Sequence, residues 1–165
     1  MKEQINISAE VNFIWQSAET LRDTYKPHQY QDIILPFVVL RRIECVLLEE
    51  RQKVEKQAEN SLKKLNPSDV KHIISTKVKD SIGFDNKSKF TFKILASEKD
   101  TAIKENFKSY INGFTDNIKT ILERFGILKE LGKLESDKLL YPIIKQYAEL
   151  DLSPTIVPNP KMGYI

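Results

Sequence analysis

The chain has 165 residues, of which 41% are hydrophobic and 30% are charged, with a formal net charge of +3. These values favour one globular domain and argue against disordered, fibrous or strongly cationic phosphate-binding chains. One cysteine and two histidines exclude a disulfide or a zinc-type cluster, and no apolar run is long enough to span a membrane. We therefore expect a soluble, cytoplasmic protein without a metal site.

The first third of the sequence predicts two helices of different character. Apolar residues recur at three- and four-residue steps over residues 9–24, and the break at Lys26-Pro27-His28 ends this helix because residues before proline avoid the helical conformation. A longer helix follows, apolar over residues 33–47 and charged over residues 49–64. We expect its first half to be buried, its second half to be solvated, and a kink at Pro36.

The middle of the chain begins with a clear signal and then becomes ambiguous. Asn66-Pro67-Ser68-Asp69 is a turn and helix cap that predicts a short third helix reaching Val78. In the segment 81–97, apolar and polar residues alternate over residues 90–94, which fits either a short strand or an apolar loop packed on the helices.

Three further helices are predicted in the second half of the chain. Asp100 and Thr115 are placed to cap two consecutive amphipathic helices, and Ser136 is placed to open a last one. The predicted fold is therefore an all-α bundle of about six helices. It covers residues 1–150, with an irregular segment and possible short strand near 81–97.

The last residues, 151–165, differ from the rest. Pro154, Pro158 and Pro160 are incompatible with a regular helix or strand, so we expect an extended linker. The final residues include the apolar pair Tyr164-Ile165, and we expect the native sequence to continue into another domain.

Motifs for catalysis or cofactor binding are missing from the sequence. The five glycines are too scattered to form a phosphate-binding loop, and Cys45 lies in an apolar stripe without a nearby histidine to activate it. Asn159-Pro160 resembles the start of the Asn-Pro-Pro-aromatic signature of adenine methyltransferases, but Lys161 and Met162 replace the second proline and the aromatic residue. We expect no catalytic, cofactor-binding or metal-binding residue.

The least balanced charge lies in the segment 71–93, where six lysines face two aspartates and phenylalanines are interleaved. Lysines neutralise phosphates and aromatic rings stack on bases, so this segment is a candidate nucleic-acid surface; the alternative is a solvated loop. Arg41-Arg42 is a second candidate, with pairing to Glu44 or Glu49 as its alternative. The candidate nucleic-acid contacts are Lys77, Lys79, Lys87, Lys89, Lys93, Arg41 and Arg42.

Several runs of the sequence resemble a known family. Residues 13–22, 25–30 and 33–47 resemble the start of the DNA-methylation (M) subunit of type I restriction-modification systems. Residues 151–165, with Asp-Leu-Ser-Pro and Met-Gly-Tyr-Ile, resemble the junction between the helical N-terminal domain and the methyltransferase domain of that subunit. Asp23 departs from the family pattern, in which a glycine is often found after Leu-Arg.

The resemblance implies a bacterial or archaeal enzyme that transfers a methyl group from S-adenosylmethionine to N6 of adenine in DNA. Two M subunits would assemble on one specificity subunit, and restriction subunits would join them for cleavage. The cofactor and catalytic motifs of the family lie beyond this sequence, so no catalytic residue is carried over, and this domain would help to enclose DNA and to assemble the subunits. The alternative is a self-standing helical interaction module that offers the charged half of its long helix to a protein.

Overall fold

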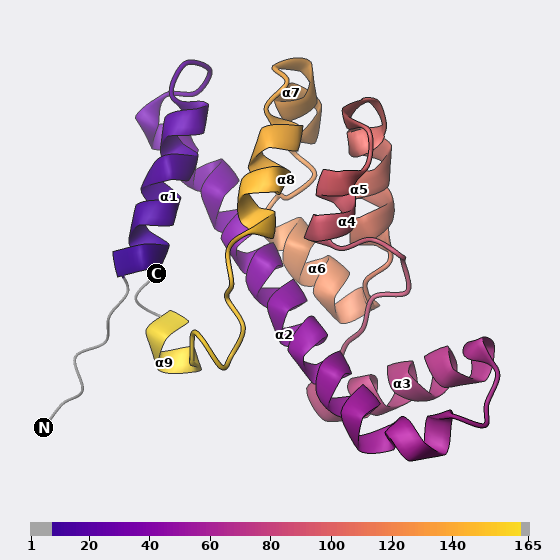
Figure 1. Ribbon diagram of the computed structural model, residues 1–165. Helices are drawn as coiled ribbons and strands as arrows, with labels where there is room; N and C mark the ends of the chain where they lie inside the picture. The colour runs from indigo at the N-terminus through magenta and orange to yellow at the C-terminus, as the bar shows by residue number, and fades with distance from the viewer. Residues whose placement is uncertain (1–7, 163–165) are drawn as a thin grey trace, which may run out of the picture.

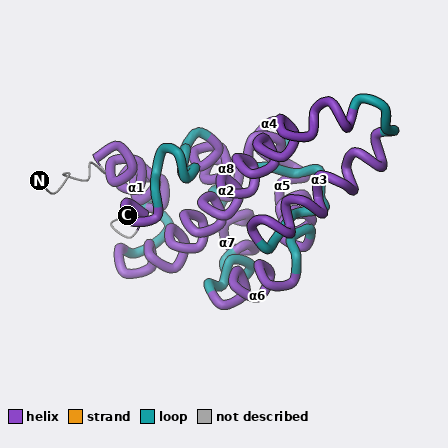
Figure 2. The backbone as a smooth tube through the Cα atoms, turned by 90° about the horizontal axis from the view of Figure 1, so that it is seen from below, coloured by secondary structure: helices purple, strands orange, loops and turns teal. Residues whose placement is uncertain are grey.

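The structure is a computed structural model that describes residues 8–162. Within this range the chain is all-α, with nine α-helices and no strand, which confirms the predicted fold class (Figures 1 and 2). The α-helices are α1 (Ser8–Leu21), α2 (Tyr30–Leu62), α3 (Pro67–Ile82), α4 (Phe92–Ser97), α5 (Ile103–Asn112), α6 (Asp116–Arg124), α7 (Leu131–Ser136), α8 (Leu140–Ala148) and α9 (Asn159–Met162), and two 3-10 helices cover Pro27–Gln29 and Asp100–Ala102.

Helix α2 is the longest element, with 33 residues, and it runs diagonally through the molecule (Figure 1). Its first half supplies most of its buried side chains, including Phe37 and Leu40, whereas only Val54 and Ala58 are buried after Leu47. The predicted division into a buried and a solvated half is therefore confirmed. It arises because the apolar stripe of this helix stops where the charged sequence begins.

The core lies where α4, α5 and α8 pack together beside the first half of α2 (Figure 1). The ring of Phe37 is at its centre: its centroid lies 5.8 Å from that of Phe107, 6.5 Å from that of Phe92 and 5.6 Å from that of Tyr147. Aromatic contacts of this kind each contribute about 0.5–1.5 kcal/mol beyond the area they bury. Long-range aromatic packing therefore holds the later helices against α2.

The end of α2 and the whole of α3 form a hairpin that projects from the bundle (Figure 1). As the sequence predicted, Asn66 caps α3: its side-chain oxygen accepts a hydrogen bond from the Asp69 amide at 2.9 Å. Helix α3 continues past Val78 to Ile82 and is followed by Gly83, whose φ of +83° is a left-handed conformation that glycine adopts without strain. The third helix is thus longer than expected.

Of the two alternatives for residues 81–97, a short strand or an apolar loop, the strand is not formed. Residues 92–97 are helix α4 instead, capped by Thr91, whose hydroxyl accepts a hydrogen bond from the Ile94 amide at 3.2 Å. Phe92 and Leu95, three residues apart, are fully buried. The buried residues of this segment therefore follow the spacing of a helix and not the two-residue alternation of a strand. The irregular part is the loop at residues 84–91, which contributes one isolated bridge between Asn86 and Phe114.

Two expected helix starts also differ in detail. Ser136 ends α7 rather than opening the last helix, and the following Lys138 adopts a left-handed φ of 58° before α8 begins. Asp100 and Thr115 stand at the starts of the expected segments, but neither makes a side-chain capping hydrogen bond. The short helices α4, α7 and α9 explain why the described chain contains more helices than six.

The sequence predicts an extended linker at residues 151–165, but residues 151–162 pack against the helices. Leu152 and Val157 are fully buried, and the Arg42 guanidinium donates to both of their carbonyl oxygens at 2.6 Å. The prolines do prevent a long helix, but they do not prevent the apolar residues between them from entering the core. Residues 163–165, on which part of the linker prediction falls, lie outside the described residues.

Candidate nucleic-acid interface

The loop at residues 84–91 is held to α2 and α3 by a buried carboxylate. One oxygen of Asp85 accepts from Arg51 Nη2 at 2.6 Å, and the other accepts from Ser75 Oγ at 2.6 Å. Burial favours protonation of Asp85, but the hydrogen bonds from Ser75 and Arg51 outweigh it and hold its pKa below the ordinary value of 3.8. Asp85 therefore stays ionised and joins α2, α3 and the loop.

The same loop is held to α5 by Asn86. Its amide nitrogen donates to the Tyr110 carbonyl at 2.9 Å, its amide oxygen accepts from the Ser88 backbone at 2.8 Å, and the Lys87 amide donates to the Gly113 carbonyl at 2.8 Å. A side chain at Gly113 would collide with the Asn86 amide oxygen and lie 2.9 Å from the Ser88 nitrogen. The absence of a Cβ at this position allows the loop to approach α5.

A groove of about 970 Å³ lies between α3, the facing part of α2 and this loop. Its apolar surface includes Val70, Ile74 and Ile94, which are partly exposed, and the exposed Leu65. Four basic side chains face two carboxylates in its lining, which leaves a surplus of two positive charges. The basic residues are Arg51, Lys71, Lys87 and Lys89, and the acidic residues are Glu55 and Asp85.

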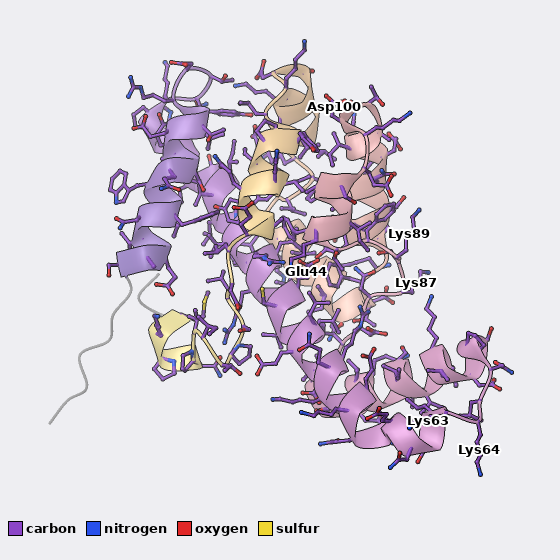
Figure 3. The ribbon with its side chains drawn as sticks, in the orientation of Figure 1. Glu44, Lys63, Lys64, Lys87, Lys89 and Asp100 are labelled. Carbon is purple, nitrogen blue, oxygen red and sulfur yellow. The ribbon has the colours of Figure 1, made fainter. Side chains whose placement is uncertain are left out.

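The structure separates the lysines that the sequence grouped together. All five predicted lysines are exposed, but only Lys87 and Lys89 line this groove, and Figure 3 shows both on the loop beside the bundle. Lys77 and Lys79 lie on the second half of α3, outside the groove. Lys93 lines a different hollow of about 660 Å³, whose lining also contains the carboxylates of Glu49, Glu149 and Asp151.

Arg41 is used inside the protein. Only 6% of it is exposed, and its guanidinium donates to the carbonyl oxygens of Leu150 at 2.8 Å and Ala148 at 3.1 Å while pairing with Glu44. Arg42 donates to the tail, including the Asn159 side-chain oxygen at 2.8 Å. Both guanidinium groups therefore have acceptors within the protein. For Arg41, the structure shows the pairing with Glu44 that the sequence left open as the alternative to DNA contact.

Glu44 on α2, labelled in Figure 3, is the centre of a buried polar network. Besides pairing with Arg41, it accepts hydrogen bonds from the Tyr110 hydroxyl and the Phe92 amide, each at 2.9 Å. Burial and the adjacent carboxylate raise the pKa of Tyr110 well above its ordinary value, so its hydroxyl remains a donor. The network connects α2, α4, α5 and, through Arg41, the end of α8, and we assign it a structural role.

Three lysines near the candidate surface are not among the predicted contacts, although Lys71 belongs to the basic segment 71–93. Lys71 lines the groove from the first half of α3, and Lys63 and Lys64 lie exposed at the far end of the α2–α3 hairpin (Figure 3). The cap at Asn66 was the available signal, because a helix that restarts after a short turn can fold back along the previous one. That geometry brings Lys71 into the same groove as Arg51 and Glu55 of the second half of α2.

Two negative findings apply to residues 8–162. No group of three or more His, Cys, Asp or Glu side chains could hold a metal ion. None of the helices in this range is both long and apolar enough to cross a membrane.

The fold and this surface define a helical domain with a basic groove built on fixed elements. The family model for the HsdM N-terminal domain matches residues 11–146, which is most of the chain. The chain therefore belongs to this family, the N-terminal domain of the M subunit of type I restriction-modification systems, and the sequence resemblance is confirmed. No curated protein and no solved structure matches the chain.

Proposed function

We propose that this domain helps to hold DNA in a type I adenine methyltransferase and contributes to the assembly of its subunits. The observation that carries the proposal is the basic groove: its loop lysines are exposed, while their backbone is tied to α2, α3 and α5. Lysines on a fixed backbone can neutralise phosphates with little loss of backbone entropy. Family membership supports the same conclusion.

This domain would be one part of a larger methyltransferase. The full-length subunit would transfer a methyl group from S-adenosylmethionine to N6 of adenine, with the cofactor and catalytic residues in a separate methyltransferase domain. A second M subunit, the specificity subunit and restriction subunits would be the protein partners. No residue of this chain has a role in the chemical step, and sequence recognition belongs to the specificity subunit.

The alternative of a self-standing interaction module draws on the projecting α2–α3 hairpin (Figure 1). Opposite charges nearly cancel on the α2 part of this hairpin, as in the Lys53–Glu49 pair at 3.7 Å, and exposed balanced surfaces are typical of solvated helices. The groove beside the hairpin keeps its positive surplus. We therefore favour the DNA-holding role over a protein-docking role for this face.

The salt dependence of DNA binding tests the proposal. In the assembled methyltransferase, Lys77, Lys79, Lys87 and Lys89 would be replaced together by glutamine, and DNA affinity measured over a range of salt concentrations. If two of these lysines contact phosphates, the slope of log affinity against log salt should flatten by about 2. The control is Lys53→Gln with Lys56→Gln on the charged half of α2, which should leave the slope unchanged. An unchanged slope in the fourfold variant would refute the role of this segment.

A further inference from the structure

We infer that the groove between α3 and the loop at residues 84–91 binds the sugar-phosphate backbone of DNA. Lys71, Lys87 and Lys89 are its phosphate contacts, and Lys77 and Lys79 are not. This inference rests on the proposed function and goes beyond it, because it assigns the site and the chemical group that the site binds.

Lysines from two separate elements converge on this groove. Lys71 comes from α3 and Lys87 and Lys89 come from the loop, yet all three line one groove. Within residues 8–162 none of the three forms an ion pair, so their ammonium groups are available to an anion. Lys77 and Lys79 flank Val78, which is fully buried. Successive helical side chains point about 100° apart, so these two lysines leave α3 on either side of its packed face.

Part of the negative charge in the groove, that of Asp85, is already compensated within the protein. The Asp85 carboxylate is engaged by Arg51 and Ser75, so it opposes an incoming phosphate less than a free carboxylate would. Glu55 is the remaining carboxylate of the lining, and it is exposed. Removing the charge of Glu55 should therefore strengthen binding, whereas removing either lysine of the loop should weaken it.

The side chains that line the groove determine which part of DNA it can recognise. Arginine and asparagine are among the side chains that read base edges with paired hydrogen bonds, and the lining contains one of each. Arg51 is bound to Asp85 and the Asn86 carbonyl, and the Asn86 amide is bound to Tyr110 and Ser88. The ammonium groups of Lys71, Lys87 and Lys89 form no ion pair within the described residues. That of Lys89 lies 5.2 Å from the centroid of the partly exposed Phe90 ring. Such ammonium groups suit phosphates. Arg51 is a positioning residue that fixes the loop.

Two double variants within one segment test the assignment. Lys87→Gln with Lys89→Gln and Lys77→Gln with Lys79→Gln each remove two positive charges, and all four side chains are exposed, so neither pair should disturb the fold. In the assembled methyltransferase, the first pair should flatten the salt slope by about 2 and the second should leave it nearly unchanged. Glu55→Gln should tighten binding at low salt. The preference for the recognised sequence over a mismatched one should be the same in all three variants.

The possible results separate this inference from the proposed function. Equal flattening by the two pairs would overturn the groove assignment and leave the DNA-holding role intact. If neither pair of lysine substitutions flattened the salt slope, both the groove assignment and the DNA-holding role would be refuted. A loss of sequence preference in the Lys87→Gln, Lys89→Gln variant would show that the groove reads bases, which contradicts backbone binding.

Discussion

Arg51 and Asp85 lie 34 positions apart in the sequence and form an ion pair at 2.6 Å. Arg51 is on the charged half of α2, and Asp85 is in the loop that carries Lys87 and Lys89. The same carboxylate accepts from Ser75 on α3, so one side chain sets the positions of all three walls of the basic groove. The ionised state of the Asp85 carboxylate is therefore linked to the shape of the candidate site.

Stability should depend on the ionisation of Asp85. Because its pKa in the folded protein is below 3.8, its contribution is fully present above that pH and is lost as the pH falls through the lower, folded-state pKa. Asp85→Asn should cost about 1.5–3 kcal/mol at neutral pH, the range for hydrogen bonds to charged groups. Urea unfolding of both proteins between pH 2 and 7 should show the difference shrinking below pH ~4. A difference that stays constant down to pH 2 would contradict the assigned ionisation.

The buried network around Glu44 should matter far more than a similar pair on the surface. Glu44→Gln leaves the buried Arg41 without a countercharge, and we expect a loss of about 3–5 kcal/mol. The matched control is Glu19→Gln, which breaks the Arg22–Glu19 pair with the same three-residue separation but 69% side-chain exposure, and should cost no more than about 1 kcal/mol. Thermal or urea unfolding measures both, and equal costs would show that the buried network is unimportant.

Gly113 should be intolerant of a larger residue. Gly113→Ala places a methyl group against the Asn86 side chain and the Ser88 backbone, and such overpacking costs about 1–3 kcal/mol. Gly132→Ala serves as the control, because nothing lies within 4 Å of the added atom and the residue is in a helix, where alanine is favoured. Unfolding midpoints should fall for the first variant and stay equal or rise for the second. The opposite order would mean that the loop does not need its close approach to α5.

Arg42 should hold the tail in place. Its guanidinium donates to Leu152, Val157 and Asn159, so Arg42→Ala should release residues 151–162 from α2 while leaving the core helices intact. Hydrogen exchange at the Val157 amide, which donates to the Ser153 carbonyl at 2.7 Å, should accelerate at least about tenfold. Amides of α8 provide the internal reference. Unaltered protection at Val157 would show that Arg42 is not needed, and that burial together with the Thr155–Glu49 hydrogen bonds and the Lys161–Glu10 ion pair holds the tail.

The isolated chain should not bind S-adenosylmethionine, because its sequence contains no glycine-rich cofactor loop. Calorimetric titration with the cofactor tests this expectation directly. Saturable binding tighter than about 1 mM would contradict the proposal that the cofactor site lies entirely in the following domain.

Long, strongly periodic helices could be predicted from the sequence because their signals are local. The apolar stripe of α2 repeats over several turns, and Asn66 marks the start of α3 with a hydrogen bond to its own neighbour. At residues 90–94 the apolar pattern is too short to separate a strand from a helix. Helix α4 begins where the Phe92 amide donates to Glu44, 48 positions away, and a local pattern cannot contain that partner.

The basic character of segment 71–93 was visible in the sequence by itself, because charge is a property of each residue. The sequence also determined the all-α class and, through its resemblance, the family. Only the tertiary structure decided which lysines share a groove, since this depends on the α2–α3 hairpin and on the anchoring of the loop by Asp85. It likewise decided that Arg41 faces carbonyl groups more than 100 positions away. Such partners are set by packing between helices, which residue spacing within one helix does not specify.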